Sequence, residues 1–276
     1  MNQTMITATN TLNQLQKQMD IISNNLSNLD TTGFKSRQAN FNALLYSEFN
    51  NQPDTKAEAN RLTPNGIRQG TGARLGQVQI NMSIGSLKPT GRSLDVALQK
   101  EGQYFKVLVQ NGTDSSVQYT RDGALSVSPV AENEVMLVNA AGNPVLDENN
   151  NPIIIQGNAS EYKFDENGRL SAKMTDGTTQ SFNLGMIQIN KPQFFEQKGA
   201  NLIGLTQNAG QVQGVFTELN GALRQQASVG QGMLEQSNVD MSKEMTDLLN
   251  VQRSYQFQAR SITMADQMMG LVNGIR

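Results

Sequence analysis

The sequence contains no histidine and no cysteine. Without histidine the chain lacks imidazole, the usual general base near neutral pH, and without cysteine it lacks a thiolate nucleophile. The two absences together remove nearly every ordinary zinc, copper, haem or iron–sulfur site. No disulfide bond can form, so cysteine usage says nothing about the redox compartment. We therefore expect a protein that is not an enzyme and holds no cofactor or metal.

Tryptophan is also absent, and aromatic residues make up only 5% of the chain. The formal net charge is −2 and no run of lysine or arginine occurs, which argues against a nucleic-acid partner. The longest apolar runs, such as Val135–Val138, are too short to cross a bilayer, so we expect no membrane insertion. The amino terminus lacks the basic and apolar regions of a cleaved secretory signal. Export, if it occurs, is expected to use another route.

Apolar residues in the first thirty positions recur at helical spacing. One set is seven residues apart and comprises Met5, Leu12, Met19 and Leu26; a second set, offset by three, comprises Met1, Ala8, Leu15, Ile22 and Leu29. This is the seam pattern of a coiled coil, and it predicts a helix that ends near residues 30–33, with Gly33 as a stop. The flanking positions are mainly neutral and polar, so they can pack against further helices without burying ions.

The carboxyl-terminal region has the same interval. Its apolar residues at seven-residue spacing are Met241, Leu248, Tyr255, Ile262 and Met269. Asn238 or Asp240 is suited to cap this helix, and Glu244 falls in its first turn. A second apolar stripe comprises Met264, Met268, Leu271 and Ile275. A helix that is apolar on two sides needs two neighbours, and one chain offers only one other long helix.

Between the ends, the apolar period changes from helical to alternating. Short strands are expected at residues 78–84, 104–109, 135–138, 153–155 and 186–189, separated by turn sequences such as Asn111-Gly112. The sequence therefore predicts an α+β fold in which a central all-β domain is joined to terminal helices that pair in a coiled-coil-like helical domain. We expect residues 1–49 and 233–276 to form that helical assembly domain, 50–74 a polar connector, and 75–232 the β-rich outer domain.

Three sequences that suggest chemistry have simpler explanations. The glycines at 70–76 lack the strand before and the helix after that a dinucleotide fingerprint requires. Ser160 and Lys163 have the spacing of a serine–lysine pair, but their segment alternates like a strand. Residues 147–151 contain carboxylates and amides without the ligand spacing of a calcium loop, and a solvated turn is expected there.

Three blocks of sequence resemble one protein family. The first runs from Asp20 to Lys35, and the second comprises residues 85–98, 102 and 119–123. The third comprises residues 234–241, followed by 244–245 and 252–255. In composition and order these blocks are similar to the signatures of bacterial flagellar rod and hook proteins. The length of the chain and residues 70–74 are most like a distal rod protein.

The resemblance implies a structural subunit whose terminal helices form the inner wall of a tube and whose β domain forms the outer layer. It also implies that the partners are copies of the same chain, other rod and hook proteins, and the flagellar type III export apparatus. The implied location is the flagellar basal body outside the cytoplasmic membrane, reached without a cleaved signal peptide.

The apolar seams and their polar neighbours are the expected assembly interface. This set comprises Leu12, Leu15, Met19, Ile22, Asn24, Asn25, Leu26, Leu29, Met241, Leu248, Arg253, Tyr255, Ile262 and Met269. Two alternatives stay open: a hook subunit rather than a rod subunit, and an adhesin-like binding module whose coiled-coil stalk presents a β head.

Overall fold

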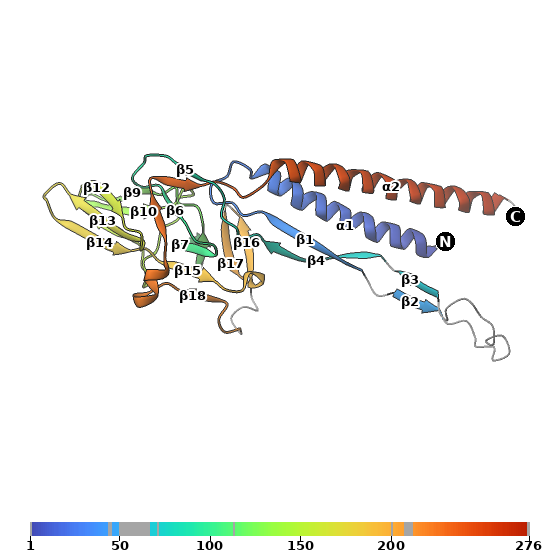
Figure 1. Ribbon diagram of the computed structural model, residues 1–276, viewed down its shortest axis with the longest axis horizontal. Coiled ribbons are helices and arrows are strands. Elements are labelled where there is room, and N and C mark those ends of the chain that lie inside the picture. The colour runs from blue at the N-terminus through green and yellow to red at the C-terminus, as the bar shows by residue number, and fades with distance from the viewer. Residues whose placement is uncertain are drawn as a thin grey trace. The chain divides into compact units, whose positions relative to one another are not determined.

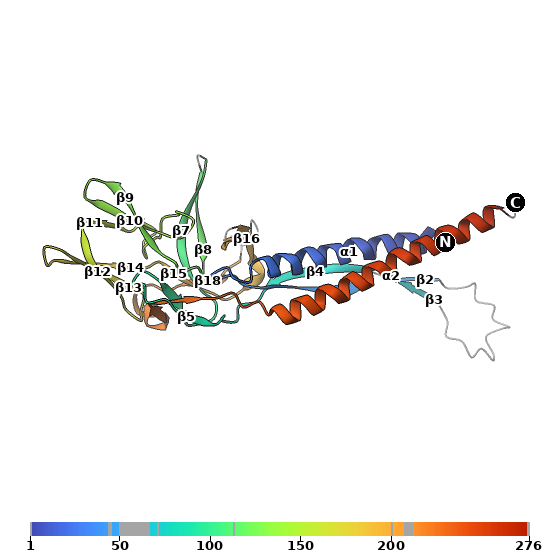
Figure 2. The same cartoon turned by 90° about the horizontal axis from the view of Figure 1, so that it is seen from above.

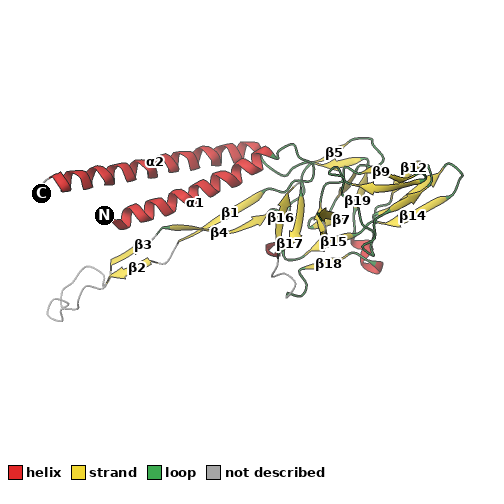
Figure 3. Cartoon of the chain, turned by 180° about the vertical axis from the view of Figure 1, so that it is seen from behind, coloured by secondary structure: helices red, strands yellow, loops and turns green. Residues whose placement is uncertain are grey.

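The computed structural model describes residues 2–43, 46–49, 67–70, 72–112, 114–199, 201–206 and 212–274. Most of the connector expected at residues 50–74, and both Met1 and Ile275, lie outside the described residues. The fold is α+β, as the sequence predicts, with a helix near each end of the chain and many short antiparallel strands between them (Figures 1 and 3). The chain divides into two compact units. We call them the helical unit (Met1–Leu26, Arg37–Val78 and Met241–Arg276) and the β unit (Ser27–Ser36 and Gln79–Asp240).

The helical unit holds both long helices and two pairs of strands. Its helices are α1 (Asn2–Ser27) and α2 (Met241–Gly274), which run in opposite directions (Figure 2). Its strands are β1 (Arg37–Ala43), which pairs with β4 (Ala73–Ile80), and β2 (Tyr46–Phe49), which pairs with β3 (Ile67–Gly70). A two-stranded ribbon is marginal alone, and here the β1–β4 pair is held to α1, because the Leu75 N–H donates to the side-chain oxygen of Gln14. No strand was predicted at residues 37–43.

Helix α1 ends earlier than the sequence predicts. Its last helical residue is Ser27, so Leu29 of the expected seam lies beyond the helix. Gly33 was expected to stop the helix, but it occupies the left-handed region (φ +67) in the segment that follows. There its N–H donates to the carbonyl of Glu235 at 2.8 Å. The segment after residue 30 therefore leaves the helix for backbone partners in the β unit.

The β unit is built from antiparallel sheets. The largest has the strand order β16-β17-β8-β7-β15-β18, and two smaller sheets have the orders β11-β10-β9 and β12-β13-β14. Two strand pairs, β5 with β20 and β6 with β19, complete the unit. The bounds are β5 Leu87–Pro89, β6 Val96–Leu98, β7 Gln103–Asn111, β8 Asp114–Thr120, β9 Ser126–Ala131, β10 Glu134–Val138, β11 Ile154–Gln156, β12 Ala159–Phe164, β13 Arg169–Met174, β14 Thr179–Asn183, β15 Met186–Ile189, β16 Phe195–Gly199, β17 Leu202–Leu205, β18 Phe216–Glu218, β19 Val229–Gln231 and β20 Met233–Glu235. Two 3-10 helices, η2 (Pro192–Phe194) and η4 (Gly221–Gln226), lie in its connections.

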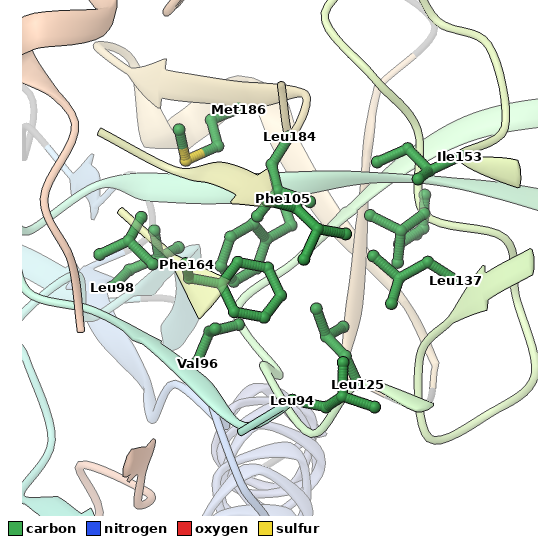
Figure 4. Packing of buried hydrophobic residues seen from close by; sticks show 14 of the residues in the cluster. Leu94, Val96, Leu98, Phe105, Leu125, Leu137, Ile153, Phe164, Leu184 and Met186 are labelled. Carbon is green, nitrogen blue, oxygen red and sulfur yellow. The ribbon is translucent and has the colours of Figure 1, made fainter. Parts of the chain in front are cut away.

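Two apolar clusters form the core of the β unit. The larger one, built around Phe105, Phe164 and Leu184, gathers side chains from most of the sheets (Figure 4). The smaller one packs the Tyr119 ring edge-on against Phe195 and tilted against Phe216, with ring centroids 5.9 and 5.8 Å apart. Leucine, isoleucine and valine dominate the larger cluster.

Most of the expected strands are confirmed, and one is shorter than expected. The alternation at residues 78–84 predicts a strand through Ile84, but β4 ends at Ile80 because the backbone at 81–86 turns to other partners. Ser160 and Lys163 lie on strand β12, so they do not share a helical turn. Residues 147–151 form a turn in which one Asp147 carboxylate oxygen accepts the N–H groups of Asn149 and Asn151.

Candidate functional site

Helix α1 uses its apolar face inside the helical unit. Ala8 and Ile22 are buried, and the other described residues of its seam, including Leu12 and Leu15, are half-buried. The opposite face exposes polar positions such as Asn13 and Gln16. Because its exposed face is mainly polar, α1 leaves little apolar surface for another molecule.

Asn25 ties three elements of the helical unit together. Its side-chain nitrogen donates to the Arg37 carbonyl at 2.9 Å and to the Glu244 carboxylate at 3.1 Å. Its side-chain oxygen accepts the Arg37 N–H at 3.0 Å. Asn25 is 1% exposed, and Glu244 is also buried. A buried, fully bonded amide in an apolar seam sets the register of the elements around it.

Helix α2 differs from α1 because it is apolar on both faces. One face buries Val251 and Ala265, together with the Glu244 side chain. The exposed apolar side chains recur at helical spacing and comprise Met241, Met245, Leu249, Phe257, Met264, Met268, Leu271 and Val272. We call these eight residues the exposed α2 stripe. Phe257 is 67% exposed and Leu271 is 69% exposed, so the single chain leaves this surface in water.

Within the β unit, three segments that are distant in sequence bond to one another. They are residues 32–36, 81–86 and 233–238, and we call their meeting point the three-segment junction. Asn238 links all three: its side-chain oxygen accepts the Ser36 N–H at 2.7 Å, and its nitrogen donates to the carbonyls of Asn81 and Ser83. The Gln236 N–H donates to the Ser86 carbonyl.

A buried carboxylate lies at the centre of this junction. One Glu235 oxygen accepts hydrogen bonds from Lys35 Nζ at 2.6 Å and from the Gly85 N–H at 2.9 Å. The other oxygen accepts a hydrogen bond from Arg121 Nε at 2.5 Å. The remaining Arg121 nitrogens donate to the carbonyls of Gln103 and Leu98, and Lys35 also donates to Ser83. All three charged side chains are at least 95% buried. We call Lys35, Arg121 and Glu235 the Glu235 cluster.

The Glu235 cluster holds two cations and one anion out of water. A buried ion pair adds little net stability over an apolar replacement, but removing one partner leaves an unpaired buried charge and costs about 3–5 kcal/mol. Burial and the neighbouring Arg121 charge lower the pKa of Lys35 to about 8, against the opposing attraction of Glu235 and Glu101. The cluster therefore specifies which segments meet.

From these groups we expect the β unit to be most stable at alkaline pH. Lys35 has a pKa of about 8 in the folded chain and about 10.5 in the unfolded chain. The unfolded chain therefore binds more protons between these two pH values, so the free energy of unfolding increases as pH rises from about 8 to about 10.5. Burial raises the pKa of Tyr104, and raises that of Tyr119 to about 12, so the unfolded chain loses phenol protons first above pH 10 and stability falls. The free energy of unfolding, measured in urea from pH 7 to 11, is expected first to rise with pH and then to fall. Lys35→Met should remove the rise and leave the fall. An unchanged rise in that variant would contradict its attribution to Lys35.

The residues of the expected assembly interface fall into three classes in the single chain. Ile22 and Asn25 are buried. Those that are half-buried are Leu12, Leu15, Met19, Leu26, Leu29, Leu248, Tyr255, Ile262 and Met269. Met241, Asn24 and Arg253 are exposed. The side-chain hydrogen bonds of Asn25 lie within the helical unit, to α2 and to β1. The role of the set between subunits stays a prediction.

Sequence reasoning gave no role to Lys35, Arg121 or Glu235. Each lies inside one of the three sequence blocks that carry the family resemblance. The sequence does place one charged residue in each block. A single sequence, however, does not show which residues 200 positions apart contact each other in the folded chain. Asn238 and Asp240 were the two expected caps of α2; α2 begins directly after Asp240, and the Asn238 side chain bonds to the junction instead.

No group of three or more acidic side chains lies close enough to hold a metal ion within the described ranges. Neither long helix, over its described length, is apolar enough to cross a bilayer.

Comparison with known proteins identifies the family. A model described as "Flagella basal body rod protein" matches residues 5–35, and one described as "Flagellar hook protein FlgE/F/G D1 domain" matches residues 99–172. A third, "Flagellar basal body rod FlgEFG protein C-terminal", matches residues 231–275. The flagellar hook-basal body complex protein FlhP of Bacillus subtilis is 46% identical over the full length of both chains. This chain belongs to the flagellar rod and hook protein family.

Other relatives carry the name of a rod protein. The flagellar basal-body rod protein FlgG of Borreliella burgdorferi is 33% identical and covers 98% of this chain and 97% of its own. FlgG of Bacillus subtilis is 27% identical, so this chain is more similar to FlhP than to FlgG of the same species. As a family member, the chain is a structural flagellar rod or hook subunit with a flagellar location, and FlgG-like names favour the rod. The three residues of the Glu235 cluster fall one in each of the three matched regions.

Proposed function

We propose that this rod/hook subunit polymerises through its terminal helices into a helical tube and transmits torque along the flagellar rod. The observation that carries the proposal is the exposed α2 stripe, an apolar face that α1 does not cover. Burying apolar side chains gains about 1.5–3 kcal/mol each as an upper limit, and α2 is already ordered on its other face. Neighbouring copies therefore bury the stripe at little further entropic cost.

The parts of the chain have different roles in this proposal. Residues 1–49 and 233–276 form the assembly domain, residues 50–74 connect it, and residues 75–232 form the outer layer. A contact between different surfaces of successive copies produces open helical growth when the rotation between the copies does not close a ring. We infer no catalytic role, because the buried carboxylate of the Glu235 cluster is fully occupied by structural donors.

The proposal extends to partners and location. The chain contacts other rod and hook proteins at the two ends of its segment of the tube. It leaves the cell unfolded through the flagellar type III export apparatus, without a cleaved signal peptide, and assembles outside the cytoplasmic membrane. A hook position is the second candidate, favoured by the match to the hook D1 model and by the name of the relative FlhP.

Charge placed in the helical seams tests this function. Leu26→Asp and Ile262→Asp are each expected to abolish motility on swim plates and incorporation into purified basal bodies, because a carboxylate cannot be buried unpaired between helices. Gln16→Asp and Gln267→Asp, which place the same charge at exposed positions of α1 and α2, should keep near-normal motility. Normal motility in both seam variants would refute assembly through the helices.

A further inference from the structure

The last strands of the β unit supply partners for its first strands. Among the described strands, β5 pairs only with β20 and β6 pairs only with β19. Their registers place Leu87 opposite Glu235 and Val96 opposite Gln231. Apart from the Val96 N–H bond to the Gly123 carbonyl and the Asp95–Ala124 bridge, the unit's opening strands have no ladder partner until residues 229–235 arrive.

The same late residues complete the three-segment junction. Gly33 reaches the Glu235 carbonyl, Ser36 reaches the Asn238 side chain, and Lys35 reaches the Glu235 carboxylate. The two partners of the Lys35–Glu235 bond are 200 positions apart. Closing this loop costs chain entropy that no local interaction offsets, so the hydrogen bonds and ion pairs that form at closure have to provide the stability.

The Glu235 cluster connects this closure to the middle of the unit. Arg121 is fully buried, and its guanidinium donates to Gln103 and Leu98, at the start of β7 and the end of β6. The β7 strand in turn is central in the six-stranded sheet. Without Glu235, a buried guanidinium beside the main core has lost its only described carboxylate.

We propose that residues 229–238 act as a closing segment, so that the β unit folds only after this segment has joined residues 32–36. The amino terminus emerges first during synthesis, and it would also emerge first in the proposed export. Until about 85% of the sequence has emerged, the β unit is then incomplete and stays unfolded. The closing segment stands on the contacts of the β unit; only its use during export rests on the proposed function.

Hydrogen exchange on the full chain tests the closing segment. In Glu235→Gln and Asn238→Ala, backbone protection is expected to fall at the junction and also at the distant β13, by a similar factor. We expect roughly 100-fold or more for Glu235→Gln, the scale set by an unpaired buried charge. Glu161→Gln, a change of the same type at an exposed position of β12, should leave β13 protection within about threefold of wild type.

The pattern of protection decides the outcome. Loss confined to residues 81–86 and 233–238, with β13 unchanged, would overturn the proposal, because the β unit would then stay folded with its junction open. An equal loss in Glu161→Gln would overturn it as well. If Glu235→Gln does not fold, Asn238→Ala, which keeps the charges paired, supplies the same comparison. Failure of the motility test with this exchange pattern intact would reject the assembly function and leave the closing segment standing.

Discussion

Phe257→Asp is expected to abolish incorporation of the subunit into the rod while leaving the free subunit folded. Phe257 is 67% exposed in the single chain, so a carboxylate there stays in water and the free energy of unfolding should change by no more than about 0.5 kcal/mol. In the polymer the same position would be buried against a neighbouring copy, where an unpaired charge is not tolerated. Swim-plate motility, basal-body composition and urea unfolding of the purified chain together measure both halves of the expectation.

The matched control for this variant is Gln256→Asp. Gln256 is the preceding residue and is also exposed, but its side chain is polar and points about 100° away from Phe257 around the helix axis. This control should incorporate and swim nearly as well as wild type. Equal incorporation of Phe257→Asp and Gln256→Asp would show that the stripe is not a subunit contact. A large loss of stability in free Phe257→Asp would show that the stripe is already covered in the single chain.

Gly33→Ala is expected to destabilise the β unit by about 3 kcal/mol or more. Gly33 has φ +67, and a side chain there would place Cβ 2.6 Å from backbone atoms of Arg121 and Asp122. Left-handed backbone alone costs an alanine about 1–2 kcal/mol, and the overlap with rigid backbone adds to that. Because Thr32 donates to the Asp122 carboxylate, the displacement would also break that bond. Denaturant unfolding followed by tyrosine near-ultraviolet circular dichroism measures the loss.

Gly142→Ala separates the two causes of that loss. Gly142 also has a positive φ, of +82, but nothing lies within 4 Å of the Cβ that alanine would add. It should therefore cost only about 1–2 kcal/mol, the backbone cost alone. If both variants lose the same stability, close approach at Gly33 plays no part.

The elements that could be predicted from sequence are those specified by local periodicity. Seven-residue spacing predicts both terminal helices, and alternation predicts strands such as β7, β10 and β15, because side-chain direction repeats every 3.6 residues in a helix and every two in a strand. Residues 37–43 gave no such signal, because strand β1 is rich in polar residues and depends on its partners, β4 and the side chain of Asn25.

The candidate site was only partly accessible from sequence. The exposed α2 stripe was foreseen in its second half, at Met264, Met268 and Leu271, because helical spacing shows it directly. The Glu235 cluster was not foreseen, because its members come from three distant segments and only the folded chain brings them together. Lys35 is hardest to foresee, since a lysine beside a helix end is most often solvated.

The amide of Asn25 fixes the axial position of α1 relative to β1 and to the first turn of α2. A seam of leucine and methionine tolerates sliding, because moving one helix by a heptad presents an equivalent set of side chains to its partner. Asn25 removes that freedom: any slip would strip both backbone groups of Arg37 and the carboxylate of Glu244 of their shared partner at once. A tube built from such subunits would keep a constant length per subunit under axial load. One polar side chain would fix that length, because apolar contacts alone allow several equivalent positions.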